Sequence, residues 1–172
     1  MGAERSGEWF RRMVIGHALT VASDRPPDIL ELGSGSGAFA STALAEAGFA
    51  SIGVDRSSSV LNDVRVGAER MNGGVRPLYL AMDPDRLEFG DDVFDIVCGT
   101  SVDLGRLGEV ARVLRPDGAA VFAQPNGMRR EELTLATRHF GRVEARTFRR
   151  DLAAVLRRRA RAVVLRLTEP RG

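Results

Sequence analysis

The sequence contains no lysine: all 25 basic residues are arginines, and 23 acidic residues balance them to a net charge of +2. The pI near 9.4 therefore reflects the high pKa of arginine rather than a strongly basic protein at neutral pH. An arginine-only chain rich in alanine and glycine is typical of a GC-rich genome, so we expect a bacterial protein.

Cysteine and long apolar runs are also scarce. The single cysteine, Cys98, excludes an internal disulfide and favours a reducing compartment. No apolar run approaches the roughly 20 residues of a membrane span. The charged segment 1–13 lacks the apolar stretch of a secretory signal. We expect a cytoplasmic protein without a membrane span.

The length and composition fit one domain. The chain has 172 residues, 44% of them hydrophobic, and two independent domains would each be small. We expect a single domain over 1–172, with an N-terminal helix in 1–25 and the core in 26–172.

Helix and strand patterns alternate along the chain, which predicts an α/β domain with a mostly parallel sheet. Strands are expected at 29–32, 50–55, 75–83, 93–100, 119–124, 141–148 and 161–169. Helices are expected at 8–23, 38–47, 57–71, 104–118, 130–138 and 149–161.

The segment ILELGSGSGAFA, residues 29–40, leads from a strand into a helix through glycines at every second position. Backbone without Cβ atoms admits a close ligand, and the following helix offers free N–H groups. Gly33, Gly35 and Ala38 fit the dinucleotide pattern G-x-G-x-x-A. Asp55 follows Gly33 at a distance where a carboxylate can bind ribose hydroxyls. This pattern fits either a dinucleotide or S-adenosylmethionine.

Three further features favour S-adenosylmethionine. Glu31 stands beside the glycine turn, where it would repel a pyrophosphate but suits a ligand with a sulfonium and an ammonium group. Asp83 ends the third expected strand, where it can accept a hydrogen bond from an adenine amine. The block EVARVLRPDGAAVF follows the fourth strand. A nicotinamide oxidoreductase, the alternative, depends on the glycine spacing alone.

Over residues 29–122 the sequence resembles the class I S-adenosylmethionine-dependent methyltransferases, and beyond them in strand order only. ELGSGSG matches the motif E/D-x-G-x-G-x-G, and GVDRSSSVL matches the second-strand acid motif. MDPDRLEFGDDVFDIV matches the stretch with the adenine-contacting acid. RVLRPDG matches R-V-L-R-P-G-G, with Asp117 replacing a glycine. The resemblance implies a three-layer Rossmann-like sandwich, with a mostly parallel seven-stranded sheet, helices on both faces and an N-terminal helix over the cofactor.

The resemblance also implies a site for S-adenosyl-L-methionine, with S-adenosyl-L-homocysteine as the product. The residues implied for the methionine part and the methyl group are Glu31, Gly33, Ser34, Gly35, Gly37, Cys98, Gly99 and Thr100. Those implied for the ribose and adenine are Asp55 on the ribose hydroxyls, Asp83 on the adenine amine, and Arg56, Met82 and Pro84 beside the ring. Two alternatives stay open: Glu31 as a solvated strand-end acid and Asp83 as a turn former.

No catalytic residue and no metal site is predicted. Methyl transfer from a sulfonium is a direct displacement, so an aligned nucleophile can suffice and a general base is optional. His17, on the N-terminal helix, is one candidate base, although a lone histidine on an apolar helix face is more often a packed core residue. His139 is expected at a helix end, and Cys98 as a buried strand residue.

The expected loops are too short to enclose an acceptor. The segments 98–107 and 123–133 leave no room for a lid, and no Asn/Asp-Pro-Pro-Tyr/Phe motif ends the fourth strand. We expect an open site for an unidentified small, carrier-bound or macromolecular acceptor, with a homodimer or partner subunit as further options. The alternative function is a non-catalytic binding subunit or regulator that needs a partner. The arginine-rich segment 148–167 fits nucleic-acid contact or, more simply, a solvated helix face.

Overall fold

The structure is a computed structural model that describes residues 2–22, 25–33, 39–59, 62, 75–124, 128–149 and 161–171. Its strands are β1 (Ile29–Leu32), β2 (Ile52–Asp55), β3 (Leu78–Ala81), β4 (Phe94–Thr100), β5 (Leu114–Gln124), β6 (Phe140–Arg149) and β7 (Arg161–Pro170). Its helices are α1 (Gly2–Val21), α2 (Phe39–Glu46), the 3-10 helix η1 (Leu104–Arg106), α4 (Leu107–Val113) and α5 (Arg130–His139).

The seven strands form one sheet in the order β3-β2-β1-β4-β5-β7-β6. Strands β1 to β5 are parallel to one another, whereas β7 runs antiparallel to β5 and β6 antiparallel to β7. The expectation of a mostly parallel seven-stranded sheet is therefore confirmed. Because connections between parallel strands return over the faces, all carboxyl ends of β1 to β4 meet at one edge.

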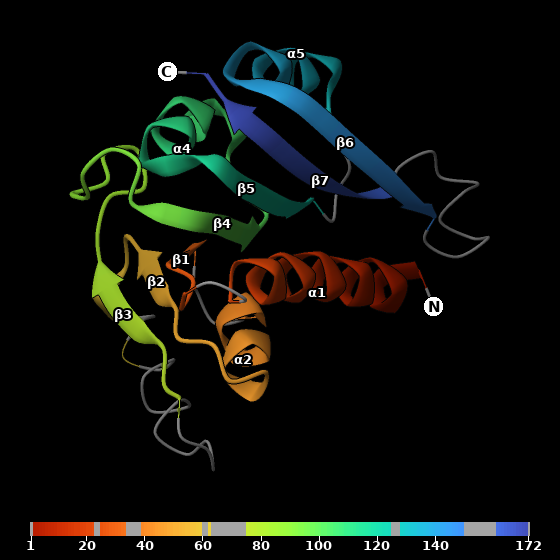
Figure 1. Cartoon of the computed structure of the whole chain (residues 1–172). Coiled ribbons are helices and arrows are strands. Elements are labelled where there is room, and N and C mark those ends of the chain that lie inside the picture. The colour runs from red at the N-terminus through yellow and green to blue at the C-terminus, as the bar shows by residue number, and fades with distance from the viewer. Residues whose placement is uncertain are drawn as a thin grey trace.

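Helices cover both faces of this sheet, as Figure 1 shows: α1 and α2 lie on one side, and α4 and α5 on the other. Alternate residues of the strands supply two cores. On the α1 side, Phe10 and Val14 of α1 pack with Ile96 of β4. On the opposite side, Val110 of α4 packs with Val97 of β4. The fold is the expected three-layer Rossmann-like sandwich, whose central strands are buried on both faces.

Two element boundaries differ from the sequence expectation. Helix α1 begins at Gly2 rather than at residue 8 and ends at Val21. The expected helix 104–118 is instead η1 followed by α4, and it ends at Val113, with β5 starting at Leu114. Proline 116 disfavours helical backbone at Arg115, so the helix ends before these residues rather than at the proline. The expected helices at 57–71 and 149–161 lie almost entirely outside the described residues.

At the amino ends of the strands, the buried carboxylate of Asp95 ties β4 to the segment that joins α1 to β1. Its side chain is 3% exposed and pairs with Arg25 and Arg115. The Asp28 N–H also donates to Asp95 Oδ2, at 2.8 Å. Two cations and a backbone donor thus compensate one buried anion, which would be costly if left alone.

We predict that Asp95→Asn lowers the free energy of unfolding by about 2–4 kcal/mol, because it leaves two arginines without their buried counter-charge. Chemical denaturation monitored by circular dichroism measures this change. Asp117→Asn is the matched control, since Asp117 is an exposed acid near the same edge. Equal stabilities of the two variants would contradict a stabilising role for Asp95.

The stabilisation by Asp95 should depend on pH. Burial alone would raise the pKa of Asp95, but the hydrogen bonds from Arg25 and Asp28 and the charge of Arg115 hold it below its ordinary value. The folded protein therefore releases this proton more readily than the unfolded chain. The contribution is complete above the unfolded-state pKa of about 4 and is lost as the pH falls through the folded pKa. In urea titrations, the stability difference between wild type and Asp95→Asn should become smaller as the pH falls from about 6 to about 3, a range that includes the unfolded-state pKa of about 4. A difference that stays constant over this range would contradict the predicted pH dependence.

Candidate cofactor site

The carboxyl ends of β1, β2 and β3 are joined by main-chain hydrogen bonds. The Gly33 N–H donates to the Val54 carbonyl at 2.9 Å, and the Met82 N–H donates to the Asp55 carbonyl at 3.0 Å. The residues that directly follow three adjacent strands are therefore held side by side. The structure brings Gly33, Asp55 and Met82 together, as the parallel sheet requires.

The glycine turn begins at Gly33, whose φ of +69° lies in the left-handed region. Glycine adopts this conformation without the steric cost that a Cβ atom imposes, so the chain can leave β1 sharply at this point. Ser34, Gly35 and Gly37 lie outside the described residues. Helix α2 is described from Phe39.

Glu31 is buried inside the sheet rather than solvated, so the alternative of a solvated strand-end acid is wrong. It is 2% exposed. Its carboxylate accepts hydrogen bonds from the Ala40 N–H at 2.9 Å, the Ser41 N–H at 3.1 Å and the Ser41 hydroxyl. A negative charge at a helix N-terminus satisfies free N–H groups and the helix dipole. Glu31 thus holds the first turn of α2 against β1.

A buried polar row extends from Glu31 across the sheet. Glu31 lies in register with Cys98 of β4 and with Gly53 of β2, which in turn pairs with Tyr79 of β3. Tyr79 shares a hydrogen bond with Ser41, and burial and the charge of Glu31 raise the pKa of its phenol. Sequence reasoning missed Ser41 and Tyr79, because only the sheet register and the packing of α2 bring them to Glu31.

Cys98 belongs to this row as a packed side chain. It is fully buried, and burial, together with the nearby charge of Glu31, raises the pKa of its thiol well above the ordinary value. A thiol that stays protonated is a poor nucleophile. This geometry agrees with the expectation of a small buried strand residue.

Asp55 and Asp83 stand at the ends of β2 and β3. The Asp55 carboxylate accepts the Ser57 N–H at 2.9 Å, and Asp55 is half-buried. Asp83 is exposed and pairs through Oδ1 with Arg56, at 2.6 Å. The hydrogen bond from Arg56, with the Asp85 N–H, holds the pKa of Asp83 below its ordinary value. Asp83 therefore helps to form the turn and also presents an ionised carboxylate.

The two expected ring neighbours, Met82 and Pro84, are set by the segment that follows β3. Pro84 is buried, and Met82 is half-buried against the α4-side core. Helix α4 holds this segment: Arg112 donates to the Leu87 carbonyl at 3.0 Å and to the Phe89 carbonyl at 2.9 Å. The connection that contains Asp83 is thus fixed from behind by α4.

The end of β4 is closely packed. A Cβ atom at Gly99 would lie 2.6 Å from the Leu32 carbonyl oxygen and 2.7 Å from Val102, so only glycine fits. Thr100 is half-buried, and Ser101 follows with a φ of +56°. Only residues 101–103 separate β4 from η1. The segment where an acceptor would approach is therefore short, as expected.

The two histidines lie away from this edge. Burial lowers the pKa of His17, as does Arg166, while its acidic neighbours Asp95 and Asp117 raise it. These neighbours belong to the middle of β7 and to the first halves of β4 and β5. His17 is thus a half-buried residue whose acidic neighbours lie in the first halves of β4 and β5.

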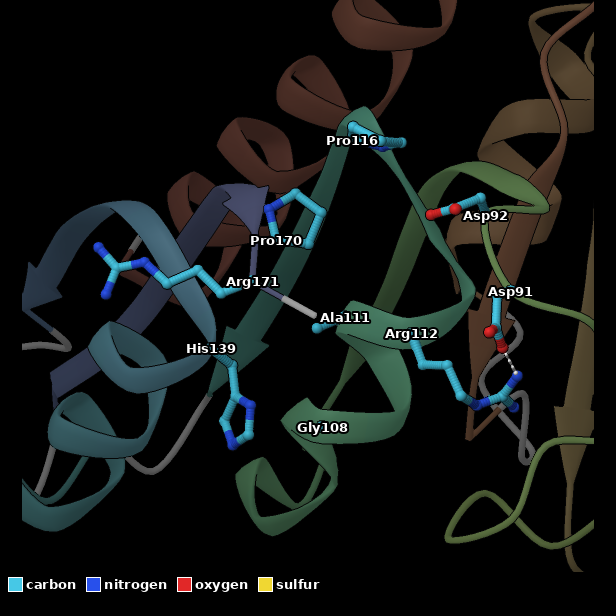
Figure 2. A pocket seen from close by; sticks show the side chains of 9 residues that line it. All are labelled: Asp91, Asp92, Gly108, Ala111, Arg112, Pro116, His139, Pro170 and Arg171. Atoms are coloured by element: carbon cyan, nitrogen blue, oxygen red, sulfur yellow. Dashed lines mark hydrogen bonds and ion pairs between the residues drawn. The ribbon is translucent and has the colours of Figure 1, made fainter.

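His139 contributes to a separate pocket of about 580 Å³. Figure 2 shows His139 and Arg171 on one side of this pocket and Asp91, Asp92 and Arg112 on the other. Because its residues precede β4 and β5 or end the antiparallel β7, the pocket lies at the amino ends of β4 and β5. None of the residues expected for the cofactor lines it.

Among the described residues, no group of three or more histidine, cysteine, aspartate or glutamate side chains is placed to hold a metal ion. No helix in the described part of the chain is long and apolar enough to cross a membrane.

The hydrogen-bond acceptors at the carboxyl edge fit an adenosyl ligand. Asp55 is the last residue of β2 and Asp83 follows β3, and both carboxylates can accept hydrogen bonds from hydroxyl and amine donors. Among the described residues, Asp83 Oδ2 has no hydrogen-bond partner, because the contacts with Arg56 and the Asp85 N–H both use Oδ1. This arrangement can accept hydrogen bonds from a ribose and from an exocyclic amine.

A model of the methyltransferase domain family matches residues 29–118, which are 90 of the 172 residues of the chain. All of the residues implied for the cofactor lie within this range. A search of curated proteins gives no match.

Solved structures of methyltransferases and of a [4+2]-cyclase share the fold. N-methyltransferase NodS from Bradyrhizobium japonicum WM9 is 15% identical, with a TM-score of 0.70 over 99% of this chain and 100% of that one. NodS in complex with S-adenosyl-L-homocysteine is 16% identical, with a TM-score of 0.67 over 94% and 86%. A SAM-dependent methyltransferase from Methanosarcina mazei is 18% identical, with a TM-score of 0.62 over 83% and 92%. The [4+2]-cyclase SpnF is 17% identical, with a TM-score of 0.69 over 94% and 82%.

We predict that Ser41→Ala lowers the free energy of unfolding by about 1–2 kcal/mol, because the buried Glu31 carboxylate loses one of its hydrogen-bond donors. Ser51→Ala is the matched control: Ser51 is also buried, and its hydroxyl has no hydrogen-bond partner among the described residues. Its loss should change stability by less than about 0.5 kcal/mol. Thermal and urea unfolding of both variants measure the difference, and a Ser51→Ala loss as large as that of Ser41→Ala would argue against the role of Ser41.

Proposed function

Because the chain belongs to the class I S-adenosylmethionine-dependent methyltransferases, we propose that it binds this cofactor at the carboxyl ends of β1 to β4 and methylates an acceptor in an open site. The family makes the chain a methyltransferase with S-adenosyl-L-methionine as its cofactor and S-adenosyl-L-homocysteine as its product. What we propose here is which residues bind the cofactor and what kind of acceptor the site admits.

The observation that carries the proposal is the row of acceptor groups at one edge of the sheet. Asp55 would take the ribose hydroxyls, and Asp83 would take the adenine amine on Oδ2. Arg56, Met82 and Pro84 would border the ring. No group in this set suits a pyrophosphate better than an adenosyl ligand, since Arg56 already pairs with two carboxylates.

Glu31 would act on the cofactor through α2. Its carboxylate holds the first turn of α2, and the glycine turn must connect this helix to β1. We propose that the main chain of Gly33, Ser34, Gly35 and Gly37 bears the methionine part of the cofactor on this fixed frame. Cys98, Gly99 and Thr100 would bound the same part from β4.

When bound, the cofactor supplies an electrophilic methyl group on a sulfonium. The role of the chain is then to bind, to orient and to limit water, because direct displacement depends on alignment. Buried Glu31 and close-packed Gly99 would form the floor of the site. No general base is proposed, since the acidic neighbours of His17 lie in the first halves of β4 and β5 and not at their carboxyl ends.

The acceptor side would be open. Residues 101–103 form the whole connection from β4 to η1. The Ser101 N–H bonds to the Ala123 carbonyl at 2.8 Å, and the Gln124 side chain donates to the Val102 carbonyl at 2.6 Å. A short connection held in this way leaves room for a large or carrier-bound acceptor. We propose that α1, a partner chain or a second copy completes the wall.

A second candidate function is a non-methylating role on the same fold. The short acceptor segment favours it, and SpnF, a [4+2]-cyclase, shows a TM-score of 0.69 to this chain. A binding subunit or regulator would retain the cofactor site without turnover. We also propose a reducing, cytoplasmic and bacterial setting, on the single cysteine and the lysine-free composition.

The proposed site can be tested by calorimetric binding of S-adenosylmethionine, S-adenosylhomocysteine and NAD. We expect micromolar binding of both adenosyl ligands and none of NAD. Asp55→Ala should weaken adenosyl binding at least about tenfold, since a charge-assisted hydrogen bond is worth about 1.5–3 kcal/mol. Asp117→Ala, at the opposite edge, should bind as the wild type does.

Two results would contradict the proposal. NAD binding with no adenosyl binding would point to an oxidoreductase. No binding of any of the three ligands would leave only the partner-dependent alternative. Adenosyl binding without methyl transfer to any panel of acceptors would favour the non-methylating role.

A further inference from the structure

Four charged side chains form a chain of ion pairs beside the proposed adenine position. Arg56 Nη2 lies 2.6 Å from Asp83 Oδ1 and 2.6 Å from Asp85 Oδ2. The other oxygen of Asp85 accepts a hydrogen bond from Arg106 Nε. The sequence Asp83–Arg56–Asp85–Arg106 is called the ionic relay below.

The ionic relay joins segments that follow three different strands. Arg56 follows β2, the two aspartates follow β3, and Arg106 ends η1 after β4. Arg106 is the anchor of the relay, because its side chain is 22% exposed whereas those of Arg56 and Asp85 are 60% and 52% exposed. The less exposed arginine at one end can therefore hold the two more exposed groups in place.

We propose that Arg106 is a positioning residue for the proposed cofactor site: through Asp85 and Arg56 it holds Asp83 so that Oδ2 faces the exocyclic amine of adenine. The inference rests on the proposed function. Arg106 acts indirectly, through Asp85 and Arg56, and contacts no ligand.

The physical argument concerns competition for Asp83. An isolated exposed ion pair contributes little to stability. Without the other members of the relay, the guanidinium of Arg56 could bind both oxygens of Asp83 as a bidentate pair. In the relay, one Nη2 is shared between two carboxylates, and Arg106 keeps Asp85 in place to take its share. Arg56 is thereby confined to Asp83 Oδ1, and Oδ2 stays available to an amine.

The relay also keeps Asp83 as an acceptor. Arg56 holds the pKa of Asp83 below its ordinary value, so the carboxylate is ionised at neutral pH. An ionised carboxylate accepts hydrogen bonds only, and it repels a carbonyl oxygen. It should therefore distinguish adenine, with an exocyclic amine, from hypoxanthine, with a carbonyl in the same position.

The test measures the dissociation constants of S-adenosylhomocysteine and S-inosylhomocysteine by calorimetry, and their ratio is the selectivity. We expect the wild type to prefer the adenosyl ligand at least about tenfold, as for a charge-assisted hydrogen bond. Arg106→Gln should reduce this ratio at least about threefold, and Arg106→Lys should restore most of it, since lysine keeps the charge. Arg138→Gln is the control, at an exposed arginine in the last turn of α5.

A second comparison tests the route. If Arg106 acts through Asp85, then Arg106→Gln has no further effect on selectivity in an Asp85→Asn background. An unchanged ratio in Arg106→Gln, or equal weakening of both ligands, would overturn the proposal, because a merely structural role weakens both. If the wild type binds neither ligand, the proposed function is itself wrong, and so is the role proposed for Arg106.

Discussion

The proposed site depends on one buried carboxylate, that of Glu31, which connects the sheet to helix α2. It lies within the sheet at 2% exposure and is compensated by the first turn of α2. A buried anion without such donors would be strongly unfavourable, so Glu31 and the first turn of α2 stabilise each other. Gly33 at the end of β1 and the start of α2 are thereby held in place relative to each other. The same residue faces Cys98 and Tyr79 in the row across the sheet, and it shapes their titration.

The two edges of the sheet carry different tasks. At the amino ends, Asp95 and its arginines join the α1–β1 segment to β4, and the pocket around His139 lies there as well. At the carboxyl ends, carboxylates that accept hydrogen bonds follow β2 and β3. Helix α4 holds the connection between the two edges, because Arg112 donates to the Leu87 and Phe89 carbonyls in the segment that leads from β3 to β4. Stability and ligand binding are thus separated along the strands, as parallel sheets allow.

Most of the fold was accessible from the sequence, since it depends on local patterns. Alternating strand and helix signals predicted the parallel sheet, and all seven strands lie close to their expected positions. The end of α4 was misplaced, because the effect of Pro116 reaches back over the residues before it. The burial of Glu31 was not visible either: its neighbours Ser41 and Tyr79 are 10 and 48 residues away along the chain.

The sequence by itself determined the family, the cofactor and the strands that end in acidic residues. Glycines and acids at strand ends can be recognised from the sequence, because their spacing along the chain is local. Only the tertiary structure decided what these acids contact. In the structure, Glu31 accepts hydrogen bonds from α2, Arg56 pairs with Asp83, and Arg106 pairs with Asp85, which lies 21 positions away in the chain. Such pairings arise where the connections that follow different strands meet at one edge, and no local pattern records which side chains will meet there.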